Sequence, residues 1–278
     1  MSDQTHVLRS GQVAATIKRH GAELCSLKTA AGGELIWQAG PEWPRHSPLL
    51  FPIVGRLNND ELRHRGKAYP MTQHGVARDH DFEWVARDES SAALVLADND
   101  ETRKRYPFAF RLAVTFALNE SDLDVTFEVT NTGREMLPAS IGAHPAFNWP
   151  LLPTLGKDSY TLTFSDDEPA PIRRLRGGLM RAKPETSPIK AGRLALSEQL
   201  FEDDLNSCSR TTPSSLTGSR VRLSATVRTR AHPSKCPGTD FRNSGSGQSR
   251  ARPFFALSRG ADSQVPKHST ASSRTSQA

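Results

Sequence analysis

Residues 111–118 read RLAVTFAL and residues 123–129 read LDVTFEV. Within each run apolar and polar side chains alternate, so the apolar ones fall on one face of an extended strand. The residues between the runs, 119–122, are polar and fit a turn. Two alternating runs joined by a short polar turn predict an antiparallel β-hairpin.

Similar alternation recurs in short runs along residues 1–204. Gly and Pro separate these runs, and no apolar segment keeps a helical period for three turns. Many short strands at near-regular spacing predict an all-β fold, a large antiparallel β-sandwich or barrel. The further predicted strands are residues 12–18, 23–27, 35–37, 82–85, 92–96 and 160–164.

The composition argues against several classes of protein. The chain has 278 residues, of which 36% are hydrophobic. No apolar run approaches the roughly 18 residues of a membrane span, and residues 1–10 lack the apolar segment of a signal peptide. The three cysteines, Cys25, Cys208 and Cys236, are an odd number without metal-ligand spacing. We therefore expect no membrane partner, no disulfide scaffold, no zinc site and a cytoplasmic location.

The chain has a net charge of +6 and consists of two regions that differ in composition. Residues 205–278 hold 12 Lys and Arg against 2 Asp and Glu, whereas residues 1–204 hold 24 against 28. The basic tail also has 16 serines, no Trp or Tyr and no sustained alternation. Ordering a residue's backbone costs about 1–2 kcal/mol, and the tail has little apolar area to offset that cost. We expect a β domain over residues 1–204 and a disordered tail over residues 205–278.

Three histidines and one arginine stand in suggestive contexts. His144 precedes a proline, His74 lies beside a glycine in a polar loop, and His46 lies in a Pro-rich loop. Arg56 directly follows the apolar segment FPIVG at 51–55. An imidazole suits proton transfer near neutral pH, and a guanidinium can hold hydroxyls or an anion. From spacing alone, a loop hydrogen bond is the more frequent role of a lone histidine. A solvated surface position is an equal alternative for Arg56.

Three motifs occur in order along the chain, and together they are more specific than any one alone. They read SPLLFPIVGRL at 47–57, QHGVAR at 73–78 and GAHPAFN at 142–148. The set resembles the aldose 1-epimerase (galactose mutarotase-like) family, most closely its shorter bacterial branch, over about residues 6–204. The resemblance implies a large antiparallel β-sandwich, the galactose mutarotase-like supersandwich, with a sugar cleft on one sheet.

The resemblance also implies an isomerase that interconverts the α and β anomers of a hexose or hexose phosphate. Ring opening needs a general acid at the ring oxygen and a general base at the C1 hydroxyl. By the resemblance His144 is the acid, and Arg56 and His74 bind sugar hydroxyls. Asp204 is the match for a further sugar-binding carboxylate. No metal or organic cofactor is implied, and the identity of the sugar and the oligomeric state stay open.

The family's general base is a glutamate in a C-terminal segment resembling CIEPW, which residues 205–278 lack. The resemblance stops at residues 201–204, where the composition also changes. A shifted reading frame can be tested on the codons that encode these residues, because each shifted codon combines the third base of one codon with the first two bases of the next. Over residues 236–260, the codons permitted by the amino acids allow the shifted reading SWHGFPQLGLWSKPGAPFLCIEPW. This reading resembles the family's missing strands, and its glutamate falls across Leu257 and Ser258. We therefore expect that the tail is out of frame, that the C-terminal strands are missing or replaced, and that mutarotation is impaired.

Two other functions are compatible with parts of the sequence. A non-catalytic carbohydrate-binding protein would keep Arg56, His74 and His144 and would need no base. A polyanion-binding protein would act through the basic tail, with strong salt dependence. The tail has three phenylalanines and no other aromatic residue to stack on bases, and its charges are scattered. We therefore expect no nucleic-acid partner.

Overall fold

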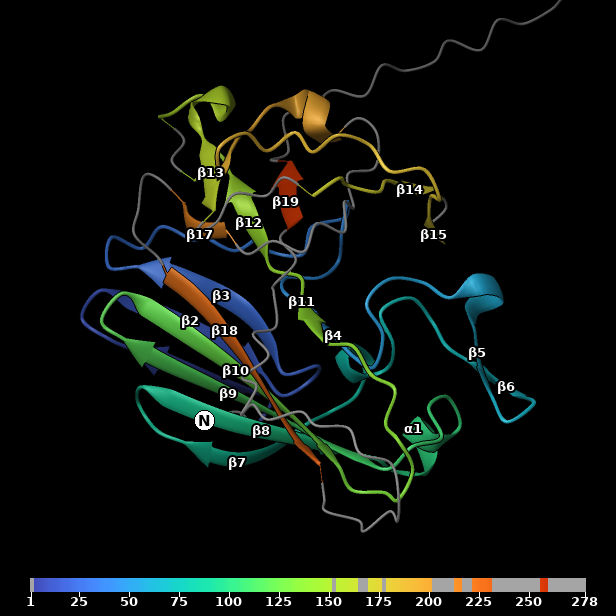
Figure 1. Cartoon of the computed structure of the whole chain (residues 1–278). Helices are drawn as coiled ribbons and strands as arrows, with labels where there is room; N and C mark the ends of the chain where they lie inside the picture. Colours follow the sequence, from blue (N-terminus) through green and yellow to red (C-terminus); the bar gives the residue numbers. More distant parts are fainter. Residues whose placement is uncertain are drawn as a thin grey trace, which may run out of the picture.

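The computed structural model describes residues 3–151, 154–164, 170–176, 179–201, 213–216, 222–231 and 256–259. Two β-sheets dominate it, and in Figure 1 the smaller sheet lies against the larger one. Within the described ranges α1 (Asp100–Arg103) is the only α-helix. The fold is the expected all-β sandwich.

The larger sheet contains the predicted hairpin. Strands β9 and β10 pair antiparallel, and Asn119 lies opposite Asp122, which leaves two residues for the turn. The strand order is β18-β10-β9-β8-β7, and β18 runs parallel to β10. The strands span Glu83–Arg87 (β7), Ser91–Ala97 (β8), Phe110–Asn119 (β9), Asp122–Asn131 (β10) and Arg222–Ala231 (β18).

The smaller sheet is an antiparallel meander of β1 (Thr5–Arg9), β2 (Val13–Lys18) and β3 (Glu23–Thr29). Alternate side chains of both sheets form one core, in which Ile17 and Leu112 are fully buried. The alternation therefore predicted the buried face correctly. Burial of apolar area at about 25 cal/mol per Å² is the main term that holds the two sheets together.

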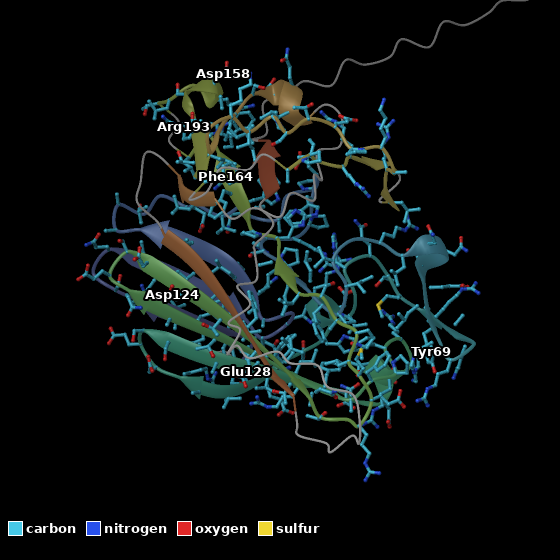
Figure 2. The ribbon with its side chains drawn as sticks, viewed as in Figure 1. Tyr69, Asp124, Glu128, Asp158, Phe164 and Arg193 are labelled. Atoms are coloured by element: carbon cyan, nitrogen blue, oxygen red, sulfur yellow. The ribbon has the colours of Figure 1, made fainter. Side chains whose placement is uncertain are left out.

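Short elements complete the fold. A second, smaller core surrounds Trp149 and includes Phe164 (Figure 2). Three short pairs are Leu49–Leu50 (β4) with Gly142–Ala143 (β11), Glu61–His64 (β5) with Lys67–Pro70 (β6), and Leu175–Arg176 (β14) with Leu179–Met180 (β15). Strand Ala146–Trp149 (β12) pairs with Ala256–Arg259 (β19). Strand Thr161–Phe164 (β13) lies between Arg193–Ala195 (β16) and Pro213–Leu216 (β17). Single turns of 3-10 helix lie at Asn58–Asp60, Ala77–Asp79, Lys157–Ser159 and Glu198–Phe201.

Two sequence expectations meet different outcomes. Residues 35–37 form no strand, since Ile36 makes one isolated bridge to Phe147; that prediction is wrong, because an apolar run becomes a strand only where a partner pairs along it. Of the predicted tail, residues 205–278, strands β17, β18 and β19 are described, and the other residues lie outside the described ranges. The disorder of those other residues and the reading frame of the tail stay predictions.

Candidate active site

The first of the three motifs lies between the other two. Strand β4 pairs with β11, and the backbone N–H of His144 donates to the carbonyl oxygen of Pro48 at 3.1 Å. On the other side, the N–H of Phe51 donates to the carbonyl oxygen of His74 at 3.2 Å. Motifs far apart in the sequence are thus joined by backbone hydrogen bonds. This pairing brings the predicted residues His74 and His144 to the same place.

Gly75 allows the His74 loop to lie directly on the first motif. Its φ is +79°, and a Cβ atom there would stand 2.3 Å from the carbonyl oxygen of Phe51. No side chain fits in that space, and the backbone conformation is one that L-residues rarely adopt. Glycine is required here because the two backbones approach each other so closely.

The two imidazoles form the centre of the site. The ring centroids of His74 and His144 are 5.9 Å apart, with the planes at 71°. The backbone N–H of Gly55 donates to Nδ1 of His74 at 3.1 Å, so this ring carries its proton on Nε2. Trp43 packs against His144, with the two ring centroids 5.5 Å apart. The aromatic neighbours hold His144 in a partly buried position.

Burial and nearby cations keep both imidazoles neutral. Desolvation, and then the charge of Arg78, lower the pKa of His144 to about 4. Desolvation likewise lowers the pKa of His74 to about 3, with further contributions from Arg78, His144 and Arg45. Among the described residues, no carboxylate contributes to either shift. Because a nearby carboxylate favours the charged form, it would raise the pKa of either ring.

Two arginines that the sequence did not single out as site residues flank the imidazoles. Arg78 is half-buried and donates from Nη2 to the carbonyl oxygen of Gln73 at 2.6 Å. Its Nε is buried without a hydrogen-bond partner among the described residues. Arg45 pairs with Asp79 at 2.9 Å. Arg78 could have been found from its place at the end of the QHGVAR motif, but no sequence signal indicated Arg45 or Trp43.

The other candidate site residues of the sequence analysis are Arg56, His46 and Asp204. Arg56 follows Gly55, and its guanidinium makes two hydrogen bonds to the carboxylate of Asp60. His46 lies 3.5 Å from Glu23 through Nδ1 and does not join the pair. Asp204, suggested as a sugar-binding carboxylate, lies outside the described residues.

Metal-ligand clusters and membrane-spanning helices were sought in the part of the chain that is described. Within it, no group of three or more His, Cys, Asp or Glu side chains is arranged to hold a metal ion. Among the same residues, no helix has the length and apolarity to cross a membrane. The imidazole and guanidinium groups of the site can form hydrogen bonds, and the imidazoles can transfer protons.

The sandwich and its loop-borne imidazole pair define a galactose mutarotase-like β protein. A family model described as Aldose 1-epimerase matches residues 4–189, and the chain belongs to this family. The plasmid-encoded protein LacX of Lactococcus lactis subsp. lactis is 36% identical over 172 residues. That match covers 59% of this chain and 58% of the relative, so the chain spans less than two thirds of the curated relatives' length.

Solved structures give the same family likeness. A galactose mutarotase related enzyme from Lactobacillus acidophilus is 37% identical, with a TM-score of 0.67 over 72% of this chain and 67% of that one. A galactose mutarotase-like protein from Lactobacillus casei is 36% identical, with a TM-score of 0.64 over 70% of this chain and 68% of that one. The resemblance inferred from the three motifs is thereby confirmed.

Proposed function

We propose that this protein is an aldose 1-epimerase-type isomerase acting on a hexose or hexose phosphate, with its activity impaired by the lack of a general base. The observation that carries the proposal is the imidazole pair: the ring centroids of His74 and His144 are 5.9 Å apart. The chain that carries this pair belongs to the aldose 1-epimerase family. In this proposal His144 is the general acid. Arg56, His74 and Asp204 bind the sugar.

The proposed reaction moves two protons and breaks one ring bond. His144 gives a proton to the ring oxygen while a base takes the proton of the C1 hydroxyl, and the C1–O5 bond opens to an aldehyde. Rotation about C1–C2 presents the other face of the aldehyde. On closure the two groups exchange roles, so every proton is returned and no oxidant or cofactor is needed.

A neutral His144 is a weak acid in the chain as it stands. Its pKa of about 4 leaves it unprotonated at neutral pH, since burial and Arg78 oppose the charged form. A glutamate beside it would supply the base and would also raise the pKa of the imidazole. In the shifted reading that glutamate falls across Leu257 and Ser258.

The decisive comparison uses the chain as given and a chain whose reading frame is restored by one inserted nucleotide near codon 205. Anomer exchange is followed by NMR with glucose, galactose and glucose 6-phosphate. We expect the restored chain to exchange anomers about 10²–10⁴-fold faster than the given chain. His144→Gln in the restored chain should abolish that gain. Normal turnover by the given chain would refute the role of the missing base.

Sequencing the gene across codons 195–278 provides an independent check. A missing nucleotide near codon 205 would support an out-of-frame tail. If sequencing instead confirms the present reading frame, the natural chain lacks the general-base glutamate, and the second candidate function is then favoured.

That second candidate is a non-catalytic carbohydrate-binding protein. The observation in its favour is that Arg56, His74 and His144 are present while the glutamate is absent. Calorimetric titration with the same sugars would show binding in the given chain, with no anomer exchange above buffer. Exchange by the given chain would exclude it.

A further inference from the structure

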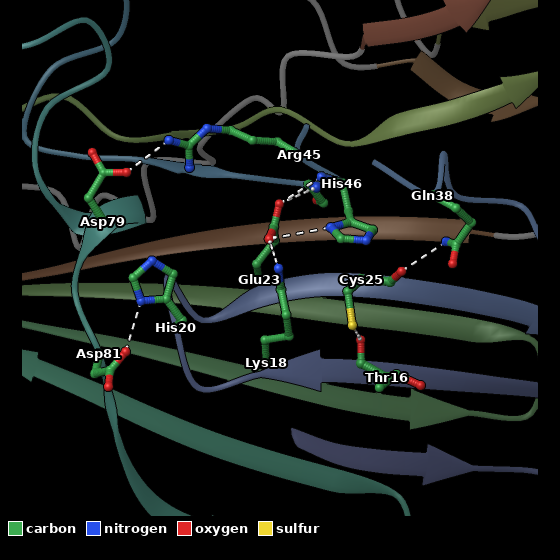
Figure 3. Close-up of polar contacts among 11 residues, drawn as sticks. Thr16, Lys18, His20, Glu23, Cys25, Gln38, Arg45, His46, Asp79 and Asp81 are labelled. Carbon is green, nitrogen blue, oxygen red and sulfur yellow. Dashed lines mark hydrogen bonds and ion pairs between the residues drawn. The ribbon is translucent and has the colours of Figure 1, made fainter. Parts of the chain in front are cut away.

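Glu23 is a buried carboxylate outside the imidazole pair. It begins β3, is 6% exposed, and accepts a hydrogen bond from Lys18 Nζ at 2.6 Å (Figure 3). Its other oxygen, Oε1, accepts from two consecutive backbone N–H groups, those of His46 at 2.8 Å and Ser47 at 3.0 Å. Burial alone would raise its pKa, but the hydrogen bonds from His46 and Lys18 lower the pKa to about 2. Glu23 is therefore an anion that holds a loop by its peptide groups.

The loop held by Glu23 also holds the segment between β11 and β12 that carries His144. The carbonyl oxygen of His46 accepts from the N–H of Ala146 at 2.9 Å, and that of Pro48 accepts from the N–H of His144 at 3.1 Å. The N–H of His46 thus points to Glu23 while its C=O accepts from Ala146. His46 links the buried carboxylate to the residue after Pro145, and Pro48 of the same loop holds the residue before it.

The same loop presents two side chains to the imidazoles. Trp43 packs against the His144 ring at 5.5 Å. The charge of Arg45, which precedes His46, contributes to the low pKa of His74. Displacing the loop would therefore change the packing of one imidazole and the electrostatics of the other.

We propose that Glu23 is a positioning residue that sets the orientation and burial of His144 through residues 43–48. The inference rests on the proposed function only for the meaning of His144 as an acid. The structural linkage itself can be tested without activity. The negative charge of Glu23 also compensates the ammonium group of Lys18, which a neutral side chain at position 23 would leave without its counter-ion.

The test uses the full chain labelled uniformly with isotopes and followed by NMR, with the His144 ring signal identified by its loss in His144→Gln. Glu23→Ala removes the acceptor of both backbone N–H groups. We expect the His144 titration midpoint to rise by about one unit or more toward its ordinary value as water enters. Exchange of the Ala146 amide should become at least about tenfold faster. Glu23→Gln keeps one acceptor oxygen but places an amide NH2 group, a neutral donor, beside Lys18, so its effect should be intermediate.

Asp88→Asn is the matched control. Asp88 Oδ1 also accepts from two backbone N–H groups, those of Ser90 at 2.8 Å and Ser91 at 2.6 Å, in the turn between β7 and β8. This control should leave the His144 signal unchanged. If Glu23→Gln behaves like the control in both midpoint and amide exchange, the proposal is overturned, whether or not Glu23→Ala folds. Loss of anomer exchange in the frame-restored chain would count against the proposed function and not against this linkage.

Discussion

The pKa values of His74 and His144 are determined by the surroundings of the two imidazoles. A solvated imidazole titrates near pH 6.5. In this site burial is the largest contribution to both pKa shifts, and the charge of Arg78 adds to it. Both rings are therefore hydrogen-bonding groups at neutral pH. In the proposed function, the use of His144 as an acid depends on a carboxylate that the described residues do not supply.

The lowered histidine pKa values predict that acid destabilises the fold in a defined range. Below about pH 6.5 the unfolded state binds protons that His74 and His144 do not bind when folded, so stability is full above that pH and falls as pH drops toward 4. We expect the urea midpoint to be lower at pH 5 than at pH 7. Replacing both histidines by Gln should flatten the slope in this range. An unchanged slope would show that the rings titrate normally.

Replacing Gly75 by alanine should destabilise the fold far more than the same replacement at Gly66, a glycine of similar backbone conformation. Gly75→Ala places a Cβ 2.3 Å from the carbonyl oxygen of Phe51, so the two motifs must separate. We expect a loss of at least about 2 kcal/mol of unfolding free energy, measured with urea. Gly66→Ala is the control, because its φ of +76° matches and nothing lies within 4 Å of the added Cβ. Equal losses in the two variants would contradict the close-approach argument.

At the scale of elements, the hairpin of β9 and β10 organises the larger sheet. The alternate residues of β9 from Phe110 to Leu118 are buried, and those between them are half-buried or exposed. A shift of one residue in register would expose the whole apolar face. The shorter elements follow other rules. Strands β4 and β11 have two residues each, so their pairing depends on neighbours and not on alternation.

Two substitutions on β9 test this face directly. Leu112 is fully buried in the core, whereas Thr115 is exposed on the opposite face. Leu112→Ala should cost about 2–5 kcal/mol of unfolding free energy through lost burial and a residual cavity. Thr115→Ala should change it by less than about 0.5 kcal/mol. A reversed order would mean that β9 sits in the other register.

At the scale of the whole molecule, the mildly acidic sandwich and the basic residues 205–278 obey different compositional rules. The family match ends at residue 189, before the composition changes. We propose that the tail is out of frame and that the family's final strands are replaced. Open sheet edges and uncovered apolar surface favour association between chains.

The given chain should therefore aggregate more readily than the frame-restored chain. At equal concentration and temperature we expect the given chain to scatter more light and to elute earlier or in the void volume on gel filtration. The restored chain should remain dispersed, because its final strands would cover the sheet. Equal dispersion of the two chains would indicate that residues 205–278 already protect the sandwich.

The sequence alone determined the class of fold and the family. Alternation in 111–118 and 123–129 predicted the hairpin and its buried face, and three motifs predicted the epimerase resemblance. These features are readable because periodicity and motif order are local. The tertiary structure decided which groups meet: His74 with His144, Arg78 and Trp43 beside them, and Glu23 behind the loop. Desolvation and charge interactions depend on distances in space between residues far apart in the chain, so no spacing along the sequence contains them.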